Sequence, residues 1–407
     1  MSVGSAIADI RKEFTILHQR VRGNDLVYFD NAATTQKPDV VISSIVEYYQ
    51  QYNSNVHRGA HYLANLATGR MEEARATIQS FVNAQSSEEI IFTQGTTDGI
   101  NLVAQAWGNG FIEEGDEILI STSEHHANIV PWQLLCQRTK AVLKIIPLNE
   151  DCSWNEDYVN LLTNKTKLVA VGWVSNATGV VHPLKEMIRK AHAVGAKVLI
   201  DAAQAVSHFP IDVQDLDCDW LVFSGHKIFG PTGIGVLFGK ATLLNVMDVY
   251  RAGGEMIDKV SFSGTTFNKL PYKFEAGTPH IEGIIAMAEG IRWWKNLGWD
   301  LINQIEKNQQ DWMSEVIQNF PELKWLGMND HRVALYSFVH QNIHPSDIGA
   351  LLDQQGIAIR TGHHCTQPLW ESLGLNGSAR ASLTVYNSEE EVNVFSKALR
   401  KSINMMM

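Results

Sequence analysis

The chain has 407 residues, 45% of them hydrophobic, which is enough for one large domain and a smaller one around a substantial core. Its net charge of −11 argues against nucleic acid or an anionic membrane as partner, because both bind clustered basic faces. The four cysteines form no Cys-x-x-Cys pair, so neither a disulfide framework nor a zinc ribbon is indicated. No stretch resembles a signal peptide or a membrane span, and we expect a cytoplasmic protein.

The N-terminal part predicts helices joined by polar loops. Apolar residues at helical spacing predict an amphipathic helix over 6–19. A short strand is expected at 27–30, and the small polar residues of 31–35 indicate a loop near a pocket. Further helices are expected from Pro38 and over 63–83, and the polar segment 53–59 is expected to be exposed unless a partner subunit covers it.

From residue 89 onward, strands and helices alternate. Strands are expected over 89–92, 117–121, 142–146, 168–173 and 197–201, with a helix before or after most of them. The helix at 183–192 is well marked, because Pro183 lies in its first turn and Gly195 ends it. Strand, helix and strand at this length imply parallel strands with right-handed crossovers. The sequence therefore predicts an α/β/α layered domain.

The C-terminal part predicts a smaller α+β domain. Residues 251–280 are expected to be a long irregular region of functional importance. After it, helices are expected over 284–297, 301–320 and from 346, and strands over 333–339 and 379–383. We expect residues 22–290 to form the large domain, and residues 1–21 and 291–407 the small one. The terminal Met-Met-Met has no explanation in the sequence.

Polar residues follow several predicted strands, where ligands gather in sheets of this kind. The segment 223–235 is rich in glycine, and its N–H groups, with Ser224 and His226, can converge on an anion. The amine of Lys227 beside such a loop indicates a covalently held, phosphorylated cofactor. The alternative is a glycine-rich turn whose lysine points into water.

Other strand ends carry candidate partners for this cofactor. Thr96 and Thr97 open a predicted helix, where phosphate binds well, although threonine there can also be a plain cap. Asp201 could hold the ring nitrogen of a pyridine cofactor, with Gln204 near the same ring, or it could cap a helix. One of His125 and His126 could stack on the ring or shuttle protons, or either could be an ordinary hydrogen-bonded histidine.

The segment 360–365 is a second cluster of chemically capable residues. Cys365 follows Arg360 and two histidines, which is typical of a nucleophilic thiol. Zinc binding and an inert cysteine are the alternatives, although no matching set of spaced ligands is near. Arg380 could clamp a substrate carboxylate with two hydrogen bonds, or form a surface ion pair.

Taken together, these stretches resemble the cysteine desulfurases of the class V aminotransferase group, specifically the SufS-like branch, over nearly the whole chain. The motifs that carry the resemblance are Asp30-Asn-Ala-Ala33, Val56-His-Arg-Gly59, Gly95-Thr-Thr97, 124–132, Val174-Ser-Asn176, Asp201-Ala-Ala-Gln204, 224–235, 274–279 and 360–365. The resemblance implies the PLP-dependent transferase fold type I. It also implies a homodimer.

The resemblance implies a role for each candidate residue. Lys227 would bond covalently to pyridoxal 5′-phosphate, His125 would stack on its ring, Asp201 would hold the pyridine nitrogen, and Gln204 would lie near the ring hydroxyl. Thr96, Thr97, Ser224 and His226 would hold the phosphate, together with Thr278 from the second subunit. Arg380 would bind the carboxylate of L-cysteine, with Asn176 and Arg360 nearby. Cys365 would be the nucleophile, and no metal is expected.

The implied reaction converts L-cysteine to L-alanine and leaves a persulfide on Cys365, for transfer to an acceptor of the SufE or SufU type in iron–sulfur cluster assembly. Two alternatives are a selenocysteine lyase acting on L-selenocysteine and a non-catalytic sulfur carrier or scaffold. The chain departs from some relatives at His280 and Thr366, where Asn and Ala are expected. These positions concern the subunit interface and the cysteine loop.

Overall fold

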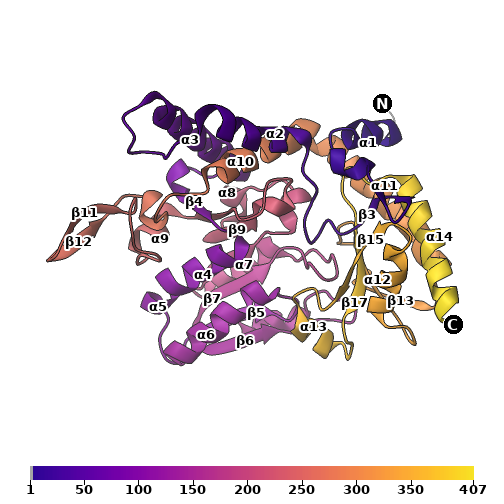
Figure 1. Ribbon diagram of the computed structural model, residues 1–407. Coiled ribbons are helices and arrows are strands. Elements are labelled where there is room, and N and C mark those ends of the chain that lie inside the picture. The colour runs from indigo at the N-terminus through magenta and orange to yellow at the C-terminus, as the bar shows by residue number, and fades with distance from the viewer. Residues whose placement is uncertain (1–2) are drawn as a thin grey trace.

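The computed structural model describes residues 3–407 and contains a central seven-stranded sheet (Figure 1). In spatial order its strands are β4 (Ile90–Thr93), β10 (Gly235–Gly239), β9 (Trp220–Ser224), β8 (Lys197–Asp201), β7 (Thr166–Gly172), β5 (Glu117–Ser121) and β6 (Val142–Ile146). The neighbours from β9 to β6 are parallel, and β10 is antiparallel to both β9 and β4. The prediction of an α/β fold with a mainly parallel sheet is confirmed.

Helices cover both faces of this sheet. One face packs against α3 (Tyr62–Val82), α7 (Leu184–Ala193), α8 (Val213–Leu216) and α10 (Ile281–Leu297), with α2 (Asp39–Glu47) beside α10; the other packs against α4 (Thr96–Ala106), α6 (Val130–Thr139) and α9 (Ala241–Val246), with α5 (Gly108–Phe111) after α4. In β5, Ile118 and Ile120 lie in one hydrophobic cluster and Leu119 in the other. Side chains alternate between the faces of a strand, so a sheet covered on both sides buries an unbroken apolar run.

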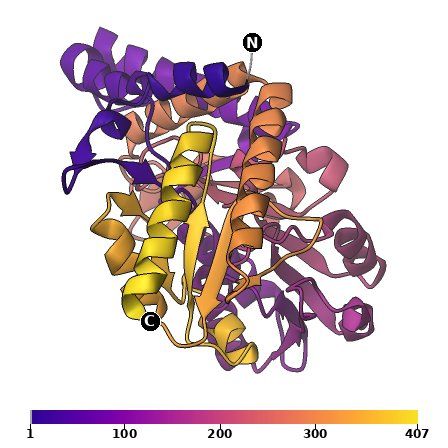
Figure 2. The same cartoon turned by 90° about the vertical axis from the view of Figure 1, so that its right-hand side faces the viewer.

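A second sheet lies in the C-terminal part of the chain. Its four antiparallel strands are, in order, β13 (Leu323–Leu326), β14 (Leu335–His340), β17 (Ser378–Ser382) and β16 (Arg360–Gly362). Two long helices, α11 (Trp299–Asn319) and α14 (Glu389–Met406), lie side by side over it (Figure 2). The remaining helices are α12 (Pro345–Asp353) and α13 (Gln367–Ser372). Met405 and Met406 lie in the last turn of α14. The predicted division into two domains stays a prediction.

The N-terminal segment joins this second sheet through a short pairing. Strand β3 (Val27–Tyr28) runs parallel to β15 (Ile357–Ala358), and Asp30 forms a bridge to Ser382 in β17. Two more short strands, β1 (Arg20–Val21) and β2 (Asn24–Asp25), form a hairpin just before it. This pairing places the segment around residue 30 beside the segment around residue 380.

The single helix predicted over 6–19 is wrong. Helix α1 covers Val3–Arg11, and a separate turn of 3-10 helix covers Thr15–His18. The guanidinium of Arg11 binds the carbonyls of Leu17 and Leu26, which holds the chain after α1 in a different path. The apolar spacing misleads here because Phe14 and Leu17 are buried without being in α1.

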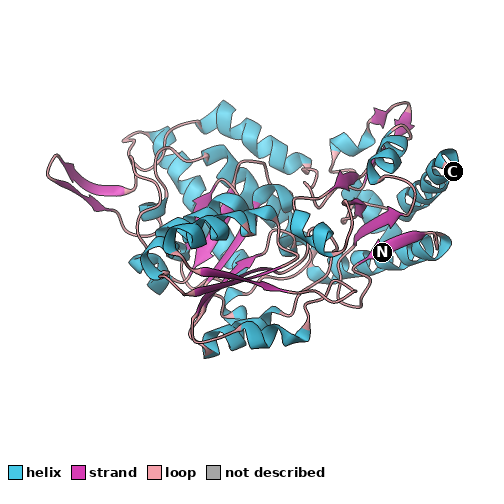
Figure 3. Ribbon diagram, turned by 90° about the horizontal axis from the view of Figure 1, so that it is seen from below, coloured by secondary structure: helices cyan, strands magenta, loops and turns pink. Residues whose placement is uncertain are grey.

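The region predicted to be irregular over 251–280 contains a hairpin of β11 (Ile257–Ser261) and β12 (Gly264–Phe267). The hairpin projects from the body of the protein (Figures 1 and 3). Nearly all of its residues are exposed, so they lack the alternation of buried and exposed side chains that marks a strand. Among residues 3–407, no helix is both long and apolar enough to cross a membrane.

Candidate active site

A cavity of about 200 Å³ lies beyond the carboxyl ends of the central strands, between the two sheets. Every sequence-predicted site residue lines it except Cys365 and Thr278. The lining residues among the predictions are Thr96, Thr97, His125, Asn176, Asp201, Gln204, Ser224, His226, Lys227, Arg360 and Arg380. The structure thus brings together segments that are far apart in sequence.

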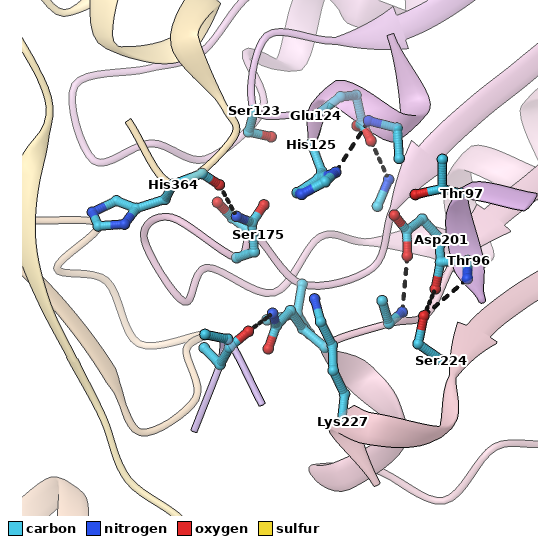
Figure 4. Close-up of a pocket in the computed structure, with 18 of the residues that line it drawn as sticks. Thr96, Thr97, Ser123, Glu124, His125, Ser175, Asp201, Ser224, Lys227 and His364 are labelled. Atoms are coloured by element: carbon cyan, nitrogen blue, oxygen red, sulfur yellow. Dashed lines mark hydrogen bonds between the residues drawn. The ribbon is translucent and has the colours of Figure 1, made fainter. Parts of the chain in front are cut away.

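Lys227 follows β9 in a single turn of 3-10 helix and extends into this cavity opposite His125 (Figure 4). Burial lowers the pKa of Lys227 to about 8, and the nearby carboxylate of Asp201 opposes that shift. An amine with such a pKa is partly neutral near physiological pH, as a nucleophilic lysine must be. The carbonyl just before it, that of His226, accepts hydrogen bonds from Thr35 N–H and Lys37 Nζ at 3.0 and 3.1 Å. These bonds fix the backbone that carries Lys227.

The first turn of α4 forms an anion cradle beside Lys227. Thr96 donates its N–H to Ser224 Oγ at 2.9 Å, and their hydroxyls lie 2.8 Å apart. The buried Nδ1 of His226 has no partner in the structure. Burial lowers the pKa of His226 to about 4, so its ring is neutral and can donate one hydrogen bond. Hydroxyls, an unpaired ring nitrogen and a helix N-terminus in one place fit a phosphate group.

Asp201 and His125 supply a carboxylate and a ring. Asp201 ends β8, is buried, and accepts a hydrogen bond at Oδ1 from Ala203 N–H at 2.9 Å. Burial raises the pKa of Asp201, and the hydrogen bond from Ala203 N–H opposes this rise. His125 Nδ1 accepts from Ala127 N–H at 3.0 Å, and burial, with Lys227 as the next cause, lowers the pKa of His125 to about 3. The His125 ring is therefore neutral, with its proton on Nε2. Gln204 donates from Nε2 to the Ala32 carbonyl at 2.8 Å.

Arg380 provides a buried cation at the side of the cavity nearest the second sheet. Its Nη1 donates to the Asn176 carbonyl at 2.7 Å, and its Nη2 to Asp30 Oδ1 at 3.0 Å. Its Nε is buried without a partner. A guanidinium with a free donor can receive a carboxylate from a ligand. Asn176 itself donates from Nδ2 to the carbonyl of His364 at 2.7 Å.

Cys365 lies on the loop after β16, just outside the residues that line the cavity. Its Sγ is 3.6 Å from Nη2 of Arg360, which does line the cavity. The thiol is half-buried, and His364 and Cys365 both have left-handed backbone, with φ of 52° and 60°. Non-glycine residues rarely adopt this conformation, so the surrounding contacts must hold the loop.

Thr278 lies elsewhere. It lines a separate pocket of about 670 Å³ together with Gly233 and His280. Its predicted contact with the phosphate of a second subunit stays a prediction.

Sequence reasoning assigned no role to several residues that line the cavity or lie beside it. Glu124, Ser175 and His182 line it, and Asp30 binds Arg380 beside it. Burial raises the pKa of Glu124 to about 7, although Ser121 Oγ, Asn128 Nδ2 and Gly172 N–H donate to it. Its place directly before the histidine pair was a usable signal, whereas His182 had none.

The structure does not favour the zinc interpretation of 360–365. Within residues 3–407, no group of three or more His, Cys, Asp or Glu side chains is arranged to hold a metal ion. His364 donates or accepts through Nε2 with Ser378 Oγ at 2.9 Å instead.

The aminotransferase class-V family model matches residues 27–395. A probable cysteine desulfurase of Synechocystis sp. is 46% identical over 99% of this chain and 97% of its own length. A cysteine desulfurase of Synechococcus elongatus is 46% identical over 98% of this chain, which spans 64% of the length of that relative. The solved apo structure of a cysteine desulfurase from Thermococcus onnurineus has a TM-score of 0.91 and 36% identity, with 98% of both chains covered.

One cavity holds a buried lysine, an anion cradle and a buried carboxylate. The chain belongs to the aminotransferase class-V family. Pyridoxal 5′-phosphate is the cofactor of this family. Lys227, Asp201, His125 and the cradle around Ser224 fit its aldehyde, ring nitrogen, ring face and phosphate in turn.

Proposed function

We propose that this protein is a cysteine desulfurase that converts L-cysteine to L-alanine and receives the sulfur on Cys365. One observation carries the proposal: a single cavity holds Lys227, Asp201 and Arg380, and its wall residue Arg360 is 3.6 Å from Cys365 Sγ. The cysteine desulfurases to which the chain is 46% identical support the same activity.

In this proposal each residue has one task. Arg380 binds the substrate carboxylate through its unpaired Nε, while Asp30 and Asn176 hold its other two nitrogens. Lys227 Nζ would hold the cofactor before substrate binds and, once displaced by the amine of L-cysteine, would be free to accept the proton from Cα of the substrate. Bound pyridoxal 5′-phosphate supplies an electron sink that makes the Cα–H and Cβ–S bonds of the amino acid labile. Asp201 keeps the ring nitrogen protonated, and the neutral His125 ring covers one face.

In the sulfur step, one sulfur atom passes from the thiol of L-cysteine to the thiol of Cys365. Cys365 Sγ attacks the sulfur of L-cysteine, an S–S bond forms, and the substrate Cβ–S bond breaks. A proton replaces sulfur at Cβ, so the products are L-alanine and Cys365 persulfide. Arg360 Nη2, 3.6 Å from Sγ, can donate a hydrogen bond to the sulfur.

The remaining parts of the proposal concern assembly and partners. We assign residues 22–290 to a cofactor-binding domain, and 1–21 with 291–407 to a domain that carries Cys365. The chain acts as a homodimer in which Thr278 completes the phosphate site of the other subunit. The persulfide passes to an acceptor protein of the SufE or SufU type for iron–sulfur cluster assembly in the cytoplasm. Crosslinking or sedimentation of the purified protein tests the dimer.

The activity is tested by measuring L-alanine from L-cysteine with the wild type and with Cys365→Ala. The proposal expects alanine from the wild type and a loss of at least about a hundredfold in the variant, since the nucleophile is removed. A variant that still desulfurates L-cysteine at the wild-type rate refutes the proposed role of Cys365. Activity on L-selenocysteine alone would identify a selenocysteine lyase instead.

A further inference from the structure

His126 connects the cofactor side of the cavity to the Cys365 loop. Its N–H donates to the Cys365 carbonyl at 2.7 Å, and its ring Nε2 accepts the Gln367 N–H at 3.0 Å. The two bonds lie on either side of Thr366. One residue therefore holds the chain just before and just after that position, in the loop whose backbone is left-handed at His364 and Cys365.

His126 is fixed in turn by the residue next to it. It begins a 3-10 turn, His126–Asn128, that His125 caps through the bond from Ala127 N–H to His125 Nδ1 at 3.0 Å. The rings of His125 and His126 are 6.3 Å apart between centroids. The turn that presents His125 to the cavity is thus the same turn that binds the Cys365 loop.

The other contacts of the loop hold neighbouring residues. Asn176 Nδ2 donates to the carbonyl of His364, and Trp370 Nε1 donates to that of His363, each at 2.7 Å. These bonds anchor the loop on its N-terminal side. On the side after Cys365, Thr366 donates its N–H and its hydroxyl to the His363 carbonyl at 2.9 and 2.8 Å, and the His126 ring holds the Gln367 N–H at the start of α13.

The ring can accept this hydrogen bond only when Nε2 has no proton. Burial, with the positive charge of His363 as the second cause, lowers the pKa of His126. The ring is therefore neutral near physiological pH, with its proton on Nδ1.

We infer that His126 is a positioning residue that sets the place of Cys365 relative to the cofactor by holding both sides of the thiol loop against the His125 turn. The inference rests on the proposed function in that Cys365 receives the sulfur. His126 does not touch the reacting atoms. It acts by keeping Sγ within reach of substrate bound beside His125, where small displacements of a reacting group slow a reaction strongly.

The test compares His126→Leu with His126→Gln in the purified, cofactor-loaded protein. Leucine fills part of the ring's space without an acceptor, whereas the Oε1 of glutamine can still accept the Gln367 N–H. The matched control is His340→Ala, which removes a similar bond, from Asn342 N–H to the His340 ring at 3.1 Å, away from the cavity.

Four readouts separate positioning from general packing. In His126→Leu, we expect amide exchange at Gln367 and iodoacetamide alkylation of Cys365 to be about tenfold faster, as for the loss of one hydrogen bond. The cofactor absorption band stays as in the wild type. For alanine formation, kcat falls about tenfold or more while KM for L-cysteine stays within about twofold, because substrate binding is untouched. His126→Gln restores all of these toward wild type, and His340→Ala changes none.

Unchanged exchange and alkylation in His126→Leu would overturn the inference, as would a loss of the cofactor band or a glutamine variant that behaves like the leucine variant. Misfolding of both variants, against a folded control, would also contradict it, since the ring would then serve the fold as a whole. Exchange and alkylation are measured without substrate. A wild type that makes no alanine would therefore refute the proposed function and leave this test standing.

Discussion

Arg380 Nη2 donates to Asp30 Oδ1 across 3.0 Å, and this pair joins two residues from opposite ends of the chain beside the cavity. Arg380 is 1% exposed, and its second contact is to the Asn176 carbonyl. With both Nη atoms held, the guanidinium plane is fixed, and its buried Nε is left without a partner.

Arg380→Lys should weaken binding of L-cysteine. Lysine keeps the charge but lacks the planar set of donors, so it cannot serve Asp30, Asn176 and a substrate carboxylate together. We expect KM to rise about tenfold or more, for a loss of about 1.5–3 kcal/mol in charge-assisted hydrogen bonding. Steady-state kinetics measure this, and an unchanged KM would remove Arg380 from the substrate site.

Lys227→Ala should abolish the covalent link to the cofactor. Lys227 is the lysine that lines the cavity within residues 3–407, so the variant has no amine there to replace it. We expect a colourless protein after gel filtration and no alanine production. Cys365→Ala is the matched control, because it should keep the wild-type absorption band while losing sulfur transfer. Retained colour in Lys227→Ala after dialysis would contradict the assignment.

The rate at which apoprotein takes up pyridoxal 5′-phosphate should depend on pH through Lys227. The neutral amine is the reactive form, and burial lowers the pKa of Lys227 to about 8. The rate should therefore rise as pH increases through about 8 and level off above it, rather than near the usual 10.5. Absorbance followed after mixing measures the rate.

Asp201→Asn provides the control for this pH dependence. The Asp201 carboxylate raises the pKa of Lys227 against the effect of burial. Removing its charge should move the midpoint to lower pH. A midpoint that stays in place or rises would show that Asp201 does not act on Lys227.

A buried ion pair outside the cavity should contribute strongly to stability. Arg75 is 1% exposed and binds Glu275 twice, at 2.7 and 2.9 Å. Glu275→Ala removes two charge-assisted hydrogen bonds of Arg75 and leaves Glu72, 3.0 Å from Nε, as its remaining carboxylate partner, so we expect the free energy of unfolding to fall by about 1.5–3 kcal/mol. The exposed pair Lys12 and Asp9 is the comparison, since Asp9→Asn should cost less than about 1 kcal/mol. Urea unfolding measures both, and equal losses would contradict the prediction.

The parts of the fold that were predictable from sequence are those with local signals. The helix at 183–192 was expected because Pro183 and Gly195 mark its ends, and α7 covers Leu184–Ala193, with Gly195 at a φ of 84°. The central strands are apolar on both faces, so each appears in the sequence as a short apolar run, and the polar residues of the site follow directly after several of these runs. The β11–β12 hairpin was missed because its side chains face solvent on both sides.

Much of the site was also predictable, because the residues that follow parallel strands meet at one edge of the sheet. The contacts between distant segments were not. The pairing of β3 with β15 brings Asp30 to Arg380, and no local pattern at residue 30 indicates it. The bond between His126 and the Cys365 carbonyl likewise depends on how the second sheet packs against the first.

The mass of the Cys365 peptide after reaction with L-cysteine tests the proposed sulfur transfer most directly. Purified, cofactor-loaded protein is incubated with L-cysteine without an acceptor, treated with an alkylating agent, digested and examined by mass spectrometry. We expect one additional sulfur atom on the peptide that contains Cys365, and none on those that contain Cys136, Cys152 or Cys218. Alanine formed while Cys365 carries no added sulfur would contradict it.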